Sequence, residues 1–124
     1  LNETRLRVVM VVHCNHYQEL DSAVTAKFYT LVDVGVTMLN QSVILKDVND
    51  NADALTDLNK ALFHHNVLPY YLHMPDPVAG TGHFYVTDEH ATQLIKKLHA
   101  SLPGYLVPML VRENPGERGK TRIA

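Results

Sequence analysis

The sequence has little cysteine, no long apolar run and no excess of one charge. Its 124 residues contain a single cysteine, Cys14, so no disulfide can form within the chain, and a reducing compartment is expected. No apolar stretch has the length of a membrane span, and no signal-peptide pattern is visible. The formal net charge is -2, which argues against nucleic acid or a membrane as the partner. These features predict a cytoplasmic protein.

Apolar runs alternate with amphipathic stretches along the whole chain. With 46% hydrophobic and 19% charged residues, the chain can build a core, and its length suits one domain or a piece of one. Extended runs are predicted at residues 7–13, 37–45, 67–73 and 105–111. The first of these runs is apolar almost throughout, which is typical of a strand buried on both faces. Helices are predicted at 19–35, at 47–66 and from a cap at Thr87 to 102–104.

This alternation predicts an α/β fold of parallel strands joined by right-handed helical crossovers. Each predicted helix has one apolar face. Those faces comprise Leu20, Val24, Phe28 and Leu31, then Leu55, Leu58 and Leu62, then Ala91, Leu94, Ile95 and Leu98. Four strands are too few to close a barrel, so the sheet is either open or part of a larger one. In both cases functional groups are expected at the carboxyl ends of the strands.

The sequence NPGERGKT at residues 114–121 presents one lysine, Lys120, and allows three interpretations. A phosphate-binding loop needs four residues between its glycines and a helix after them. Here Gly116 and Gly119 enclose two residues, and five residues follow Gly119. A polar tail is the second interpretation. The third is a lysine held on a glycine turn for covalent chemistry, as in the lysines that anchor pyridoxal phosphate.

Histidines and acids also follow the predicted strands. His13, Cys14 and His16 match no common zinc spacing, and no second cluster completes four ligands. We therefore predict no metal site, and we interpret His13 as a ligand contact and His16 as the start of the next helix. Asp76 lies between two prolines and is either a turn residue or a carboxylate for a cationic substrate group. Glu113, near the end of the fourth run, could face the same way.

Four segments, in this order, resemble the carboxyl-terminal half of the lysine 2,3-aminomutase family: HCNHYQEL, LNQSVILKDVNDN, LPYYLHMPDPVAGTGHF and PGYLVPMLVRENPGERGK. Together they reach over nearly the whole chain. The resemblance implies a radical S-adenosylmethionine enzyme that also uses pyridoxal phosphate and a [4Fe–4S] cluster. It implies a partial (β/α)6 barrel, similar to a TIM barrel, as the fold. HMPDPVAGTGHF and RENPGE are most similar to the branch that makes (R)-β-lysine to modify elongation factor P.

The resemblance implies a role for five residues. Lys120 matches the lysine that anchors pyridoxal phosphate as a Schiff base, on a turn at 114–121 whose glycines let it swing. Asp76 matches an acid that holds the side-chain amino group of a lysine substrate, and Glu113 falls where lysine-specific relatives carry a second acid. His13 and Gln41 match residues that line the S-adenosylmethionine site. Two acids disfavour glutamate as the substrate, because like charges repel.

The chain departs from the family pattern at the iron–sulfur cluster. The family binds its cluster through three cysteines in a CxxxCxxC motif, whereas this chain has one cysteine. We therefore expect residues 1–124 to be the carboxyl-terminal half-barrel of an enzyme that converts L-α-lysine to β-lysine by radical 1,2-amino migration. This half alone is expected to be inactive. The alternatives are an aminomutase for another amino acid and a non-catalytic half-barrel that serves binding or assembly.

The half-barrel interpretation also predicts self-association. The strand at 7–13 would lack its barrel neighbour, and unpaired strand edges recruit other chains. The inner face of the sheet would lose its cover and expose a large apolar patch. We therefore expect a homo-oligomer, most simply about a two-fold axis.

Overall fold

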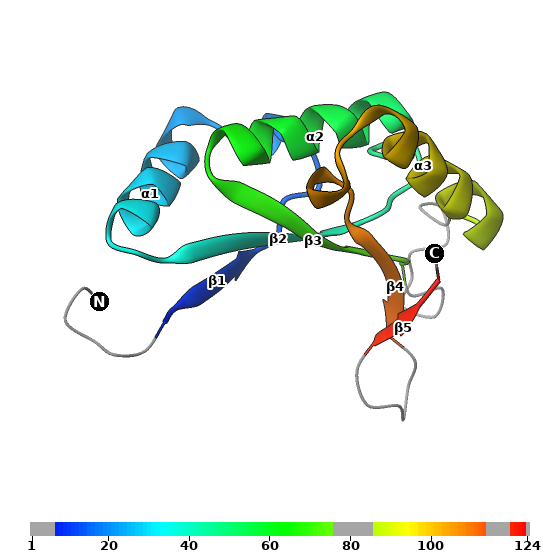
Figure 1. Ribbon diagram of the computed structural model, residues 1–124. Coiled ribbons are helices and arrows are strands. Elements are labelled where there is room, and N and C mark those ends of the chain that lie inside the picture. Colours follow the sequence, from blue (N-terminus) through cyan, green and yellow to red (C-terminus); the bar gives the residue numbers. More distant parts are fainter. Residues whose placement is uncertain (1–6, 76–85, 114–119, 124) are drawn as a thin grey trace.

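One five-stranded sheet organises the computed structural model, which describes residues 7–75, 86–113 and 120–123 (Figure 1). The strands are β1 (Val9–Val12), β2 (Thr37–Val43), β3 (Val67–His73), β4 (Met109–Glu113) and β5 (Lys120–Arg122). The helices are α1 (Ser22–Asp33), α2 (Ala52–His64) and α3 (Asp88–Ser101). Two short 3-10 helices are η1 (Tyr17–Glu19) and η3 (Gly104–Leu106).

The strands lie in the order β1-β2-β3-β4-β5, the first four parallel and the last antiparallel to β4. Figure 1 shows α1, α2 and α3 together on one face of this sheet. A doubly wound sheet carries helices on both faces and reverses its strand order, whereas a barrel adds each strand beside the last and keeps its helices outside. The predicted α/β fold is confirmed, and its order and single helical layer are consistent with half of a partial barrel.

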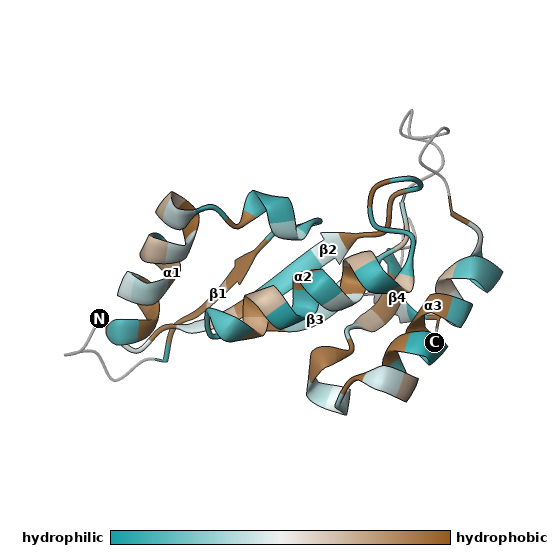
Figure 2. Ribbon diagram, turned by 90° about the horizontal axis from the view of Figure 1, so that it is seen from above, coloured by the Kyte–Doolittle hydropathy of each residue, from teal (hydrophilic) through white to brown (hydrophobic). Residues whose placement is uncertain are grey.

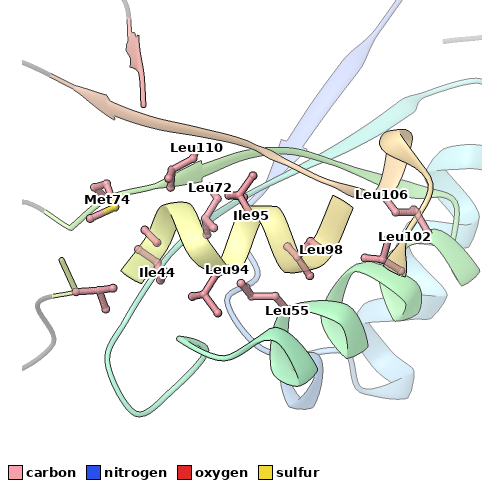
Figure 3. Packing of buried hydrophobic residues seen from close by; sticks show 12 residues of the cluster. Ile44, Leu55, Leu72, Met74, Leu94, Ile95, Leu98, Leu102, Leu106 and Leu110 are labelled. Carbon is pink, nitrogen blue, oxygen red and sulfur yellow. The ribbon is translucent and has the colours of Figure 1, made fainter. Parts of the chain in front are cut away.

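The core lies between the helices and the sheet, in two clusters. In the larger one, Leu94 and Ile95 of α3 pack with Leu55 of α2 and with Leu72 and Leu110 of the strands (Figure 3). The smaller cluster joins α1 and α2 to the first strands; its buried members are Cys14, Phe28, Val36, Met38, Leu58, Leu62 and Val67. Viewed from the helix side, the outward faces of α2 and α3 are largely hydrophilic (Figure 2). The predicted apolar helix faces therefore form the core.

Side-chain caps fix where the helices begin. Thr87 caps α3, as predicted, by accepting the His90 N–H at 3.2 Å. Asn51 caps α2 by accepting the Ala54 N–H at 2.8 Å. Gly35 follows the end of α1 with φ +95°, a backbone conformation that glycine adopts without steric cost. Across the described ranges, no helix is both long and apolar enough to cross a membrane.

Several predicted bounds are wrong. The helix predicted at 47–66 begins only at Ala52, after its cap Asn51. The run at 105–111 begins as η3, and β4 starts only at Met109, after Pro108; proline has no N–H to donate to a strand ladder. The helix predicted at 19–35 begins at Ser22, because Asp21 accepts the Val24 N–H at 2.9 Å and caps it there.

Two strands also differ from expectation. β1 is not buried on both faces: it is one edge of the described sheet, and Val9 is 55% exposed. β5 was not predicted at all. It places Lys120 at the start of an antiparallel strand, where a turn was expected over 114–121.

Candidate functional site

Polar side chains follow the parallel strands at one edge of the sheet. His13 directly follows β1 and is exposed. Gln41 lies near the end of β2 and His73 ends β3; both are half-buried. Because carboxyl ends of parallel strands meet at the same edge, residues 28 and 32 positions apart in the chain come together there. This edge contains both residues that were predicted to line the S-adenosylmethionine site.

Glu113 and Lys120 reach the same edge through β4 and β5. Their backbones face each other in the β4–β5 ladder, followed by the pair Arg112 and Thr121. The Ile123 N–H continues this pairing by donating to a β4 carbonyl at 2.9 Å. The side chains of Glu113 and Lys120 lie outside the described residues, as does Asp76. Their predicted contacts with cofactor and substrate stay predictions.

The side chains of Gln41 and His73 meet on the sheet face opposite the helices. Gln41 Oε1 lies 3.0 Å from His73 Nε2. Asn40 and Ser42, the neighbours of Gln41, are 1% and 4% exposed on the helix side, so strand alternation directs Gln41 to the other face. The ring of Tyr71 stands edge-on to His73, with centroids 5.8 Å apart. An amide, an imidazole and a phenol ring therefore share one open surface.

A β-bulge at Tyr70 brings His73 to this face. The β2–β3 register pairs Asn40 with Pro69 and then Gln41 with Tyr71, so β3 carries one extra residue. Pro69 cannot donate to the ladder, and prolines in central strands occur at bulges. In a regular ladder without the bulge, Tyr70 would pair with Gln41, and alternation would direct Leu72 to the open face and turn His73 toward the helices. The bulge next to Pro69 therefore places His73 on the same face as Gln41.

Asn40 continues the β1–β2 contact beyond the end of β1. Its side chain is buried, and its Oδ1 accepts the Cys14 N–H at 2.8 Å. In return its Nδ2 donates to the Cys14 carbonyl at 3.0 Å. One side-chain amide thus replaces a ladder pair at the residue next to His13 and fixes the backbone from which His13 projects.

Asn49 joins the segment after β1 to the segment after β2. It is 0% exposed. Its Nδ2 donates to the carbonyls of Asn15 at 2.8 Å and Val43 at 2.9 Å, and its Oδ1 accepts the Leu45 N–H at 2.7 Å. The side chain of Asn15 accepts the Val43 N–H at 2.9 Å. We call Asn15, Asn40 and Asn49 the asparagine clamp.

The clamp escaped sequence reasoning, although one signal for it was present. Asn40 stands on the face of β2 that also carries the buried residue Met38. A buried polar side chain in such a place must be hydrogen-bonded. The signal predicts that Asn40 has a partner but not which one, because Cys14 lies 26 residues away.

The contacts of Cys14 and His16 are those of residues that stabilise the fold. His16 caps η1 and not the helix predicted at 19–35: its Nδ1 accepts the Gln18 N–H at 3.2 Å, and Glu19 accepts the His16 N–H at 2.9 Å. Burial, and secondarily the charge of Glu19, raise the pKa of the Cys14 thiol. Within the described ranges, no group of three or more His, Cys, Asp or Glu could hold a metal ion. One thiol does not fit a [4Fe–4S] cluster, which requires several.

Known proteins match the sequence that builds this edge. The chain is 49% identical over 118 residues to the L-lysine 2,3-aminomutase of Escherichia coli (strain K12), covering 95% of the chain and 34% of that protein. It is 49% identical over 124 residues to the protein of that name from Haemophilus influenzae, covering 100% of the chain and 37% of the relative. The chain belongs to the lysine 2,3-aminomutase family.

A third member of the lysine 2,3-aminomutase family, from Buchnera aphidicola subsp. Baizongia pistaciae, is 44% identical over 123 residues, covering 99% of the chain and 36% of the relative. The chain therefore spans about a third of the length of the curated relatives it matches. No protein-family model matches the chain. Because the Haemophilus match covers the whole chain, it includes every strand end of the candidate site.

Proposed function

We propose that this chain is the carboxyl-terminal half-barrel of a radical S-adenosylmethionine enzyme that converts L-α-lysine into β-lysine. The observation that carries the proposal is the 44–49% identity to proteins named L-lysine 2,3-aminomutase. The single helical layer supports it, since the inner face of a partial barrel is where ligands are held. Because residues 73–84 and 112–117 resemble in sequence the branch that makes (R)-β-lysine for the modification of elongation factor P, we place the enzyme in that branch. We also propose that it acts in the cytoplasm, since the chain has a single cysteine.

The open face suits S-adenosylmethionine. That molecule offers hydrogen-bond acceptors on its carboxylate, ribose and adenine, and a flat ring that stacks on aromatic side chains. Gln41 supplies an amide, His13 supplies an exposed imidazole, and Tyr71 supplies a ring. The clamp holds the His13 segment in place before any ligand binds. The entropic cost of ordering this segment on binding is therefore small.

The β4–β5 pair suits pyridoxal phosphate and the substrate. Lys120 would hold the cofactor through its amine, from a backbone position fixed opposite Glu113. Asp76 and Glu113 would pair with the side-chain ammonium of lysine. When bound, S-adenosylmethionine and pyridoxal phosphate supply the radical and the electron-delocalising ring that the amino shift requires. The chain's own residues position both and exclude water.

The iron–sulfur cluster requires ligands from outside these 124 residues. We expect the gene, read upstream of the codon for Leu1, to encode an in-frame CxxxCxxC motif. Sequencing that region tests the proposed enzyme. An open reading frame without the motif would favour the non-catalytic half-barrel instead.

Replacing Asp76 with asparagine in the full-length enzyme is expected to weaken substrate binding. A charge-assisted hydrogen bond is worth about 1.5–3 kcal/mol, so KM for lysine should rise roughly 10- to 100-fold. Steady-state kinetics measure this, with Asp57→Asn on the exposed side of α2 as the matched control. A residue that contacts the substrate should alter kcat or KM. If both change by less than about twofold, the contact is ruled out.

We further propose that the 124-residue chain forms a homo-oligomer through β1. This strand is one of the two edges of the described sheet, and Val9 on its open face is 55% exposed. A charged residue on an edge strand prevents edge-to-edge pairing. Val11→Lys should therefore shift the chain to monomer in sedimentation velocity, while Thr30→Lys on the exposed side of α1 should not. A monomer at micromolar concentration without any substitution would contradict this proposal.

A further inference from the structure

We propose that His73 is a positioning residue, which orients the carboxamide of Gln41 so that its nitrogen donates to the ligand. The inference rests on the proposed function, because the ligand is taken to be S-adenosylmethionine. It concerns a residue to which the sequence reasoning gave no role. The contact between Gln41 Oε1 and His73 Nε2, 3.0 Å long, carries it.

The contact selects one of two amide orientations. A glutamine side chain ends in one acceptor oxygen and a donor NH2 group, and its last torsion is broad and nearly two-fold. Unrestrained, Gln41 would present either end to a ligand. With Oε1 facing His73, we assign the imidazole proton to Nε2, which then donates to the oxygen and leaves the NH2 group of Gln41 directed elsewhere. The site then offers a donor, which suits an acceptor atom of the ligand.

His73 is itself held in place. Its carbonyl accepts the Ile44 N–H at 2.9 Å, which anchors the end of β3 to the segment after β2. Its ring meets the Tyr71 ring at 61°, and the Tyr71 ring contacts the Tyr70 ring with centroids 3.9 Å apart and planes tilted by 34°. The bulge at Tyr70 sets the face on which His73 lies. A fixed donor of this kind can orient a neighbouring amide, whereas a mobile side chain could not.

The pair contributes little to the core. Gln41 and His73 are half-buried on the face that carries no helix, whereas the apolar clusters lie on the other face. A substitution that keeps the ring of residue 73 should therefore leave folding intact. This separates a positioning role from a structural one, since only the positioning role predicts an effect that passes through Gln41.

A double-mutant cycle on the full-length holoenzyme tests the proposal. The dissociation constant of S-adenosylmethionine is measured by anaerobic calorimetry for His73→Phe, Gln41→Leu and the double variant. His73→Phe keeps the contact with Tyr71 but has no donor, and we expect it to weaken binding about tenfold. His73→Gln, which restores an N–H donor, should stay within about threefold of the unmodified enzyme. In the Gln41→Leu background, His73→Phe should have no further effect.

Two further readouts keep the outcomes distinct. The visible absorption of lysine-bound pyridoxal phosphate and the melting temperature should be unchanged by His73→Phe; if either falls, the same cycle is run with His73→Leu. An equal loss of affinity with and without Gln41 would overturn the positioning role, as would a change below about twofold. If Gln41→Leu itself leaves the dissociation constant unchanged, the proposed S-adenosylmethionine site fails, and this inference fails with it.

Discussion

Replacing Lys120 with alanine in the full-length enzyme is expected to abolish the visible absorption of lysine-bound pyridoxal phosphate and to lower kcat by several orders of magnitude. Only a primary amine can anchor the cofactor covalently, and alanine has none. The backbone of Lys120 is fixed at the start of β5, opposite Glu113, and the nearest other lysine in the sequence is Lys97. Absorption spectra and steady-state turnover measure the two effects.

The matched control for this variant is Lys60→Ala, on the exposed side of α2. It removes an equivalent amine far along the chain from the candidate site and should leave both the spectrum and kcat unchanged. Persistence of the cofactor band in Lys120→Ala would show that another lysine is the anchor. In that case the role that the resemblance assigns to residue 120 is wrong, although the fold and the family assignment remain.

Asn49→Leu is expected to cause the largest loss of stability in the clamp. Leucine is nearly isosteric with asparagine, but it makes none of the three hydrogen bonds of the Asn49 side chain. The Asn15 and Val43 carbonyls and the Leu45 N–H then lose this hydrogen-bond partner. Each buried group left unpaired costs about 1–3 kcal/mol. We expect the free energy of unfolding to fall by about 3 kcal/mol or more, measured by urea titration of the 124-residue chain with every variant at the same protein concentration.

Asn51→Ala provides the comparison for that loss. Asn51 stands two residues further along the chain but is exposed, and it makes the single cap bond to the Ala54 N–H. Loss of a helix cap costs about 1 kcal/mol. If Asn49→Leu destabilises no more than Asn51→Ala, water satisfies the groups that we assign to the clamp, and the clamp does not fix the segment that carries His13.

Local periodicity predicted the elements that depend on near neighbours. The apolar spacing of Leu94, Ile95 and Leu98 identified the buried face of α3, and Thr87 identified its start. Both signals operate within one or two helical turns, so they survive in the sequence of a single chain. The strand–helix alternation then predicted parallel strands, which the β1–β4 pairings confirm.

The remaining features depend on contacts that are distant in sequence. β5 has no periodic pattern of its own and exists because β4 offers an open edge. The extra residue at Tyr70 is defined only relative to β2, although Pro69 was a clue to it. The contact between Gln41 and His73 needs both the bulge and the parallel register, so neither residue type alone could predict it.

The central claim is that this chain completes a lysine 2,3-aminomutase, and turnover of labelled lysine tests it most directly. The full-length enzyme is reduced anaerobically with S-adenosylmethionine and pyridoxal phosphate, and L-lysine labelled with ¹⁵N at the α-amino group is followed by NMR. We expect the label to move from the α-carbon to the β-carbon and to give β-lysine, with none formed by the Lys120→Ala variant. Lysine recovered with all label at the α-carbon, from protein that carries both cofactors and its cluster, would contradict the claim.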